Sequence, residues 1–367
     1  MGVKTLTKYH FKEYIFYTFI FYAIFSILIT LIQGIFRLQK FITFNPLFHQ
    51  IILFFILIYL QLIPFCLPLA SFLGVMFAVH RFKEDRELLG FYSLGFCTKD
   101  LIIPLILFGI LIFFLVFVFN FWILPNSKHT LKLMKYELMK AQFNKSFPSK
   151  KPIPIASNYV LYVEKDKKTP QKHKFKEVLL YNQVNKKTYL FISKTGILIP
   201  NKRIFILKNG WCFSLENKKK LIEIIRFKTY QFKISLKGVK SHPSFSRGEQ
   251  TFSELKYKIK TLKPGSLDYY SYLDEYWSRF LYPLSIFFLI FEAFIIAQNL
   301  STSYKFLLFF IGIGCYTLFY VFYDLFLSLG KNGTIPPPYN FLVFYGITYL
   351  TLLLQIFVFS RKKEVYL

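Results

Sequence analysis

The chain has 367 residues, of which 54% are hydrophobic and 21% aromatic, and its mean hydropathy is +0.40. This composition is too apolar for an ordinary soluble protein, so we interpret the chain as an integral membrane protein with a further domain. The net charge is +28, and residues 127–263 hold 32 Lys and Arg against 8 Asp and Glu. We therefore expect anionic partners. Nucleic acid is excluded as a partner because no nucleic-acid-binding motif accompanies this charge.

Sequence motifs for catalysis and metal binding are missing from the chain. It has no Gly-x-x-x-x-Gly-Lys-Ser/Thr phosphate loop, no nucleophile elbow and no His-Glu-x-x-His zinc motif. The four cysteines, Cys66, Cys97, Cys212 and Cys315, have neither metal-site nor redox-pair spacing. We expect no catalytic residues, no metal site and no cofactor. Any ATP-driven work would need a partner ATPase.

Six apolar runs are long enough to cross a bilayer as helices. The second run contains Pro64 and Pro68, which are expected to kink it. Three runs precede a long polar segment and three follow it. The runs are residues 14–36, 51–79, 101–124, 280–298, 306–329 and 339–359.

Basic residues in the short flanks of these runs predict the orientation. A cytoplasmic N-terminus assigns eleven of them to the cytoplasm and three to the other side, and it places the long polar segment outside the cytoplasm. The eleven are Lys4, Lys8, Lys12, Arg81, Lys83, Arg86, Lys99, Lys305, Arg361, Lys362 and Lys363, and the three are Arg37, Lys40 and Lys331.

The segment 125–265 has the alternating pattern of strands after a helix-like beginning at residues 127–143. Tyr159, Leu161 and Val163 alternate with other residues in this way. Lys208-Asn209-Gly210 resembles a tight hairpin turn between two further strands. An antiparallel sandwich or jelly roll is the class that such a meander favours.

Between the second and third runs, the sequence predicts a short helix near residues 84–94. Glu84, Asp85 and Glu87 would place negative charge at its positive end, and Gly95 would end it. The alternative interpretation is a solvated loop that joins two spans.

Two acids lie within apolar runs, Glu292 and Asp324. Intramembrane acids are costly and are therefore functional candidates, for example in proton or ion movement. The alternative is an interior pair or a hydrogen bond between helices. Arg37 and Lys40 follow the first run, where they either anchor the helix at lipid headgroups or bind a ligand.

Several stretches together resemble the LptF/LptG family of lipopolysaccharide-export permeases. Residues 80–104 are similar to the family's cytoplasmic coupling segment, with Glu87 and Leu88 followed by a small-residue break and Asp100-Leu-Ile-Ile-Pro104. Residues 274–283, 312–314 and 327–337 are similar to its fourth span, its fifth span and the following external turn. One departure is the pair Phe91 and Tyr92, where the family places a small residue.

The resemblance implies a membrane α-helical bundle of six transmembrane helices with an inserted all-β periplasmic jelly-roll-like domain. Its parts would be residues 1–124, with the coupling helix near 84–94, then the periplasmic domain 125–265, and residues 266–367. Both termini would be cytoplasmic, in a multi-pass protein of the bacterial inner membrane.

The function that the resemblance implies is that of a permease subunit in an ATP-binding-cassette transporter. It would extract lipopolysaccharide from the inner membrane and pass it to a periplasmic bridge toward the outer membrane. The partners would be an LptB-type ATPase dimer, a second LptF/LptG-type permease and an LptC-type anchor. The residues implied are Arg37 and Lys40 for lipid, and Glu84, Asp85, Glu87, Leu88 and Leu89 for ATPase coupling.

Two other functions fit the same sequence. The first is an ion- or proton-coupled transporter that uses Glu292 and Asp324 and needs no ATPase. The second is a membrane-anchored scaffold whose basic domain binds anionic polymer. Co-purification of an ATPase would distinguish the permease from the coupled transporter. A scaffold would instead tolerate replacement of its spans by unrelated anchors.

Overall fold

The computed structural model describes residues 3–42, 44, 46–95, 98–144, 153–156, 159–169, 172–184, 187–199, 204–216, 220–233, 245–300 and 305–364. The chain divides into two compact units. The helical unit comprises Met1–Ile35, Ile52–His129 and Phe245–Leu367, and the β unit comprises Phe36–Ile51 and Thr130–Ser244.

Six of the described helical segments are long and apolar enough to cross a membrane, which confirms the predicted helical membrane protein. Their apolar side chains pack into one core in the helical unit. The helical elements are α1 (Val3–Ile42), α2 (Phe48–Glu84), α3 (Glu87–Ser93), α4 (Thr98–Val118), the π-helix η1 (Phe119–Ile123), α5 (Leu124–Asn144), η2 (Arg247–Glu249), α6 (Phe252–Thr261), α7 (Leu267–Leu281), η3 (Tyr282–Leu284), α8 (Ser285–Asn299), α9 (Lys305–Lys331) and α10 (Tyr339–Glu364).

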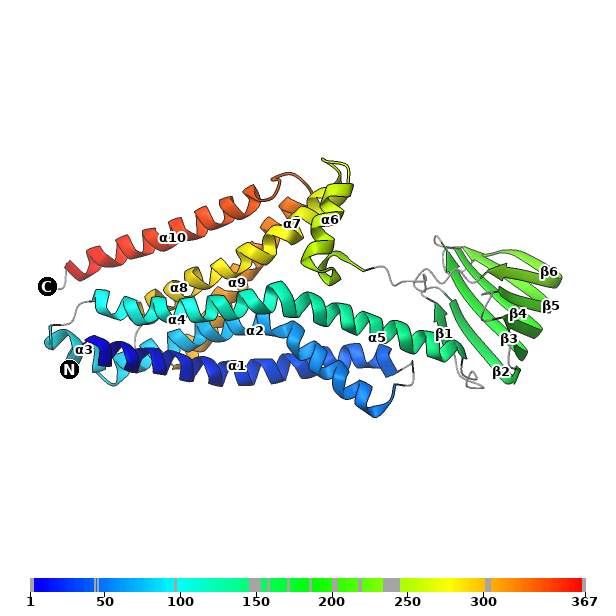
Figure 1. Cartoon of the computed structure of the whole chain (residues 1–367), viewed down its shortest axis with the longest axis horizontal. Coiled ribbons are helices and arrows are strands. Elements are labelled where there is room, and N and C mark those ends of the chain that lie inside the picture. Colours follow the sequence, from blue (N-terminus) through cyan, green and yellow to red (C-terminus); the bar gives the residue numbers. More distant parts are fainter. Residues whose placement is uncertain are drawn as a thin grey trace. The chain divides into compact units, whose positions relative to one another are not determined.

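Within the helical unit, the start of α1, the short helix α3 and the end of α10 lie at the same end of the bundle, the α3 end (Figure 1). An even number of spans requires this arrangement, because each span reverses the side on which the chain emerges.

The helix α2 continues through both of its prolines. Pro68 has no N–H group, so the carbonyl of Pro64 lacks the donor that an ordinary helix would supply from position 68. Tyr282 donates its hydroxyl to this carbonyl at 3.3 Å, and Tyr316 donates to the neighbouring carbonyl of Phe65 at 3.1 Å. The Tyr282 hydroxyl of η3 therefore replaces the missing backbone donor at Pro64, and the Tyr316 hydroxyl of α9 adds a second contact between helices beside it.

The β unit contains one antiparallel sheet in which neighbouring strands are consecutive in the chain. This confirms the inserted β domain, whose described part is a meander. Side chains alternate as predicted, since Leu161 and Val163 are fully buried and Tyr162 between them is exposed. The strands are β1 (Ile153–Ala156), β2 (Tyr159–Thr169), β3 (Lys172–Val184), β4 (Lys187–Ile199), β5 (Ile204–Glu216) and β6 (Lys220–Lys233).

The hairpin predicted at residues 208–210 is wrong, because β5 runs from Ile204 to Glu216 without a turn. Asn209 does adopt a positive φ of 53°, as the Asn-Gly pattern suggests, but within the strand. Gly210 lies against the main-chain oxygen of Ile192, where a Cβ atom would not fit. Gly210 therefore allows close strand packing, and the Asn209-Gly210 pair does not reverse the chain.

Candidate functional site

The short helix predicted near residues 84–94 is present as α3, and it begins three residues later than expected. Glu84 is the last residue of α2, and the chain turns at Asp85 and Arg86. Arg86 has a left-handed φ of 58°, which lets the new helix start directly at Glu87. Gly95, with a φ of 82°, follows the end of α3. Glu87 is the acidic residue in the first turn of α3, where its negative charge is attracted to the positive end of the helix dipole.

The helix α3 has a buried face and an exposed face. Leu88 is only 8% exposed and belongs to the core of the helical unit, and Phe91 packs against that core. Leu89 and Leu94 are 66% and 69% exposed, and Tyr92 is also exposed. Of the two leucines predicted for ATPase coupling, Leu88 is thus turned inward and Leu89 outward.

A group of charged side chains joins α3 to α1 and α2. Arg81 lies 2.6 Å from Glu13, 3.2 Å from Asp85 and 3.8 Å from Glu87. The hydroxyl of Tyr9 donates to the Glu87 carboxylate, at 3.1 Å and 3.2 Å from its two oxygens. These five residues form the α3-end network. Sequence analysis did not identify Tyr9, Glu13 or Arg81 as site residues.

At the same end, Lys83 joins α2 to the end of α8. Its ammonium group donates to the carbonyls of Gln298 at 2.9 Å and Leu300 at 2.5 Å. The last carbonyls of a helix lack partners within the helix and carry negative partial charge, so a cation is favourable there. The end of α2 is therefore tied to both α1 and α8.

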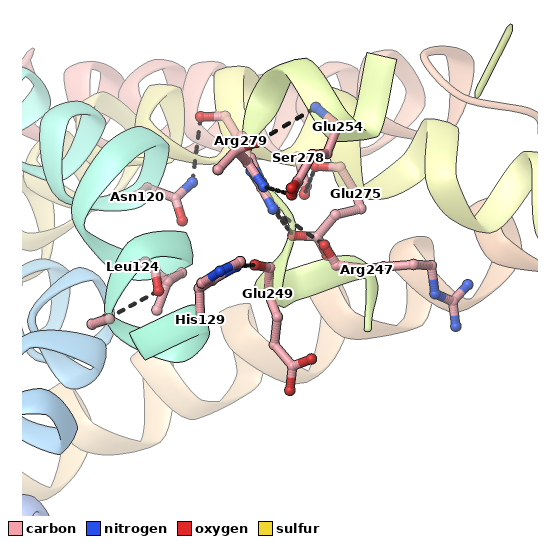
Figure 2. Close-up of polar contacts among 11 residues, drawn as sticks. Asn120, Leu124, His129, Arg247, Glu249, Glu254, Glu275, Ser278 and Arg279 are labelled. Atoms are coloured by element: carbon pink, nitrogen blue, oxygen red, sulfur yellow. Dashed lines mark hydrogen bonds and ion pairs between the residues drawn. The ribbon is translucent and has the colours of Figure 1, made fainter. Parts of the chain in front are cut away.

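A second polar cluster surrounds Arg279 of α7, whose side chain is only 3% exposed (Figure 2). Its guanidinium donates Nε and Nη2 to Glu275, at 3.2 Å each, and Nη2 to the carbonyl of Arg247 at 3.4 Å. Asn120 of the π-helix η1 donates to the Arg279 carbonyl at 3.3 Å. The buried charge is thus paired, and the cluster joins η1, α7 and η2.

Two further contacts support this region. His129 of α5 lies 3.3 Å from the carbonyl of Glu249, and its ring stacks on Phe245. Figure 2 shows the contact between His129 and Glu249. Asp274, in the stretch that resembles the family's fourth span, accepts a hydrogen bond of 2.8 Å from Asn340 of α10, and both side chains are buried. The polar side chains in the stretch 274–283 therefore hold helices together.

The two intramembrane acids have different surroundings. Glu292 accepts a hydrogen bond of 2.9 Å from Gln355 of α10, whereas Asp324 is exposed on α9. No hydrogen bond or ion pair joins the two acids within the part of the chain that the structure describes. Among the same residues, no three His, Cys, Asp or Glu side chains form a group that could hold a metal ion.

The predicted lipid-binding residues lie in the last turns of α1. Arg37 is exposed there, and the side chain of Lys40 is outside the part that the structure describes. The two positions are three residues apart on one helix, which places them on one face.

Comparison with known families matches residues 8–361 to the lipopolysaccharide export system permease LptF/LptG. Among curated proteins, the search finds no match for this chain. The family match covers the six long apolar helices, the sheet and α3. It identifies a multi-pass inner-membrane protein of lipopolysaccharide transport, a permease component and not a catalytic subunit. The chain therefore belongs to the LptF/LptG family of lipopolysaccharide export permeases.

Proposed function

We propose that this chain is the permease subunit of an ATP-binding-cassette transporter that extracts lipopolysaccharide and passes it to a periplasmic bridge toward the outer membrane. The observation that supports this best is the exposed face of α3, with Leu89 and Tyr92, which continues into Leu94 directly after the helix. The helix α3 itself lies between two spans, at the end of the bundle where α1 begins and α10 ends (Figure 1). Exposed apolar side chains outside the hydrocarbon region are typical of a protein-binding surface. Its occupant, by family membership, would be an LptB-type ATPase dimer.

The coupling residues have different parts in this proposal. Leu89 enters a groove of the ATPase, and Leu88 fixes α3 to the permease from the inside. Glu84 ends α2, Asp85 lies in the turn that leads into α3, and Glu87 lies in the first turn of α3. We expect Glu87→Ala to weaken assembly or to uncouple ATP hydrolysis from export.

Recovery of the ATPase with the purified permease tests the proposal. Leu89→Arg should lower the amount of ATPase recovered, because it places a charge in an apolar contact. The matched control is Leu267→Arg at the start of α7, since Leu267 is also 66% exposed but lies outside α3. Full recovery with Leu89→Arg, or no ATPase with the unmodified permease, would contradict the proposal.

The basic residues at the end of α1 support lipid binding. Lipopolysaccharide carries phosphates, and the planar guanidinium of Arg37 can donate two hydrogen bonds to one phosphate. Lys40, on the same face of α1, would be a second contact. In this topology the termini are cytoplasmic, Arg37 lies at the outer leaflet, and the basic β domain is a periplasmic jelly-roll-like domain that meets the bridge and the LptC-type anchor.

Asp324 supports the presence of a second permease. It is exposed on α9, within a membrane span. A carboxylate that faces lipid is costly, so we expect this face of α9 to meet protein or a water-filled cavity. A second LptF/LptG-type permease, with the lipid cavity between the two, supplies both.

A further inference from the structure

Arg81 contacts three carboxylates through three different nitrogens. Its Nη1 lies 2.6 Å from Glu13 of α1, its Nε 3.2 Å from Asp85, and its Nη2 3.8 Å from Glu87 of α3. Only a guanidinium has donors that point in several fixed directions, so lysine is not equivalent here. The contact with Asp85 stays at the end of the same helix, whereas the other two cross to other helices.

Tyr9 adds a direct link between α1 and α3. It lies four residues before Glu13 on α1, so the two side chains are on the same face of that helix. Tyr9 donates to Glu87, which therefore has one partner on α1 and one on α2. The Glu87 side chain is 26% exposed.

Aromatic packing supports these polar contacts. The buried ring of His10 on α1 makes T-shaped contacts with Phe82 of α2 and Phe91 of α3, with ring centroids 4.3 Å and 5.1 Å away. Leu88 is buried in the same core. Packed interiors resist small displacements, so α3 and the adjoining parts of α1 and α2 form one block.

We propose that Arg81 is a positioning residue for transport, which fixes α3 to α1 so that a displacement of α3 by the ATPase is passed to α1. The inference rests on the proposed function, because α3 is displaced only if an ATPase binds it. If Arg81 served folding alone, its loss would lower hydrolysis and transport together. If Arg81 transmits the displacement of α3 to α1, its loss lowers lipopolysaccharide transport while the rate of ATP hydrolysis stays unchanged.

The experiment uses the complete complex in proteoliposomes that contain lipopolysaccharide, with ATP hydrolysis and lipopolysaccharide release measured in parallel. Arg81→Gln and Glu13→Gln should each lower the lipopolysaccharide released per ATP by about two- to fivefold, the effect of losing a partly exposed ion pair. Arg81→Lys should lie between Arg81→Gln and the unmodified protein. The double variant Arg81→Gln with Glu13→Gln should release no less than Arg81→Gln alone. Arg81→Gln already removes the contact between Arg81 and Glu13, so the second change removes no further contact of Arg81.

The matched control is Lys12→Gln, which removes a charge from the same turn of α1 at an exposed position. We expect it to leave the release per ATP unchanged. Where Arg81→Gln fails to assemble, Glu13→Gln decides, since it leaves two of the three carboxylates in place.

The outcomes separate this inference from the proposed function. Absence of ATPase from the unmodified complex would mean that the proposed function is wrong, whatever Arg81 does. With an active complex, an unchanged release per ATP in Arg81→Gln and Glu13→Gln would overturn the role of Arg81. A parallel fall of hydrolysis and release in both variants would overturn it as well.

Discussion

Tyr282→Phe should destabilise the helical unit by a small and measurable amount. The change removes only the hydroxyl that donates to the Pro64 carbonyl. In membrane proteins such hydrogen bonds contribute about 0.6 kcal/mol on average and about 1.7 kcal/mol at most. The distance of 3.3 Å is longer than that of a strong hydroxyl bond, which favours the lower part of this range. We expect a loss of about 0.5–1 kcal/mol.

Reversible unfolding in mixed detergent micelles measures this loss. The control is Tyr339→Phe, which removes the same atom from an exposed side chain and should change nothing. The decisive comparison uses Pro68→Ala, which restores an N–H to the Pro64 carbonyl. Tyr282→Phe should then cost less than in the original background. An equal cost in both backgrounds would refute the argument that the hydroxyl replaces the missing helical donor.

Three further predictions concern separate parts of the molecule. Gly330→Ala should destabilise the helical unit by about 1–3 kcal/mol in the same unfolding assay, because its Cβ would overlap the carboxamide of Asn340. Arg37→Glu should abolish photocrosslinking of lipopolysaccharide near the end of α1 at normal expression, and Arg37→Lys should retain part of it. A cysteine at Lys208, exposed in the β unit, should react with an impermeant maleimide while the inner membrane is intact. The native Cys212 should add little to this labelling, because burial and a neighbouring carboxylate raise the pKa of its thiol.

Each of these predictions has a control or a contradicting result. Gly346→Ala is the control for the glycine, since a Cβ there meets no other atom. Equal lipid crosslinking in Arg37→Glu and the unmodified protein would exclude a role for Arg37 in lipid binding. Labelling of the Lys208→Cys variant only after the inner membrane is permeabilised would show that the topology is inverted.

The helices and strands could be predicted because their signals are local. Long uncharged runs identify spans without any knowledge of the partners. Alternation of side chains along 159–163 identifies β2 for the same reason, and the structure buries Leu161 and Val163 as expected. The Asn209-Gly210 pair misled the prediction, because the pattern reports a backbone that tolerates positive φ and does not reveal whether the chain turns.

The α3-end network could not be predicted, since it depends on how three helices meet. Tyr9 and Glu87 are 78 residues apart in the chain, and Arg81 and Glu13 are 68 apart. In the sequence, Arg81 is one of several basic residues that follow an apolar run and indicate the cytoplasmic side. Nothing in the residues around Arg81 in the sequence indicates which face of α1 its guanidinium will contact. Only the packing of α1 against α2 brings Glu13 within reach.

The contact of Tyr282 with Pro64 and the ion pairs of Arg81 lie at two places on α2 and allow one more prediction. It concerns the unfolding free energy of the variant that combines Tyr282→Phe with Arg81→Gln. Positions 64 and 81 are separated by about 25 Å along a helix that rises 1.5 Å per residue. Changes so far apart, with no shared partner, usually add to within about 0.5 kcal/mol. Arg81→Gln alone should cost no more than about 1 kcal/mol, because the Arg81 side chain is 35% exposed and solvent screens its ion pairs. The double variant should therefore lose the sum of the two single losses. A larger or smaller loss would mean that the Pro64 segment and the α3 end respond as one unit, and that the rigid block extends along α2 beyond the α3 end.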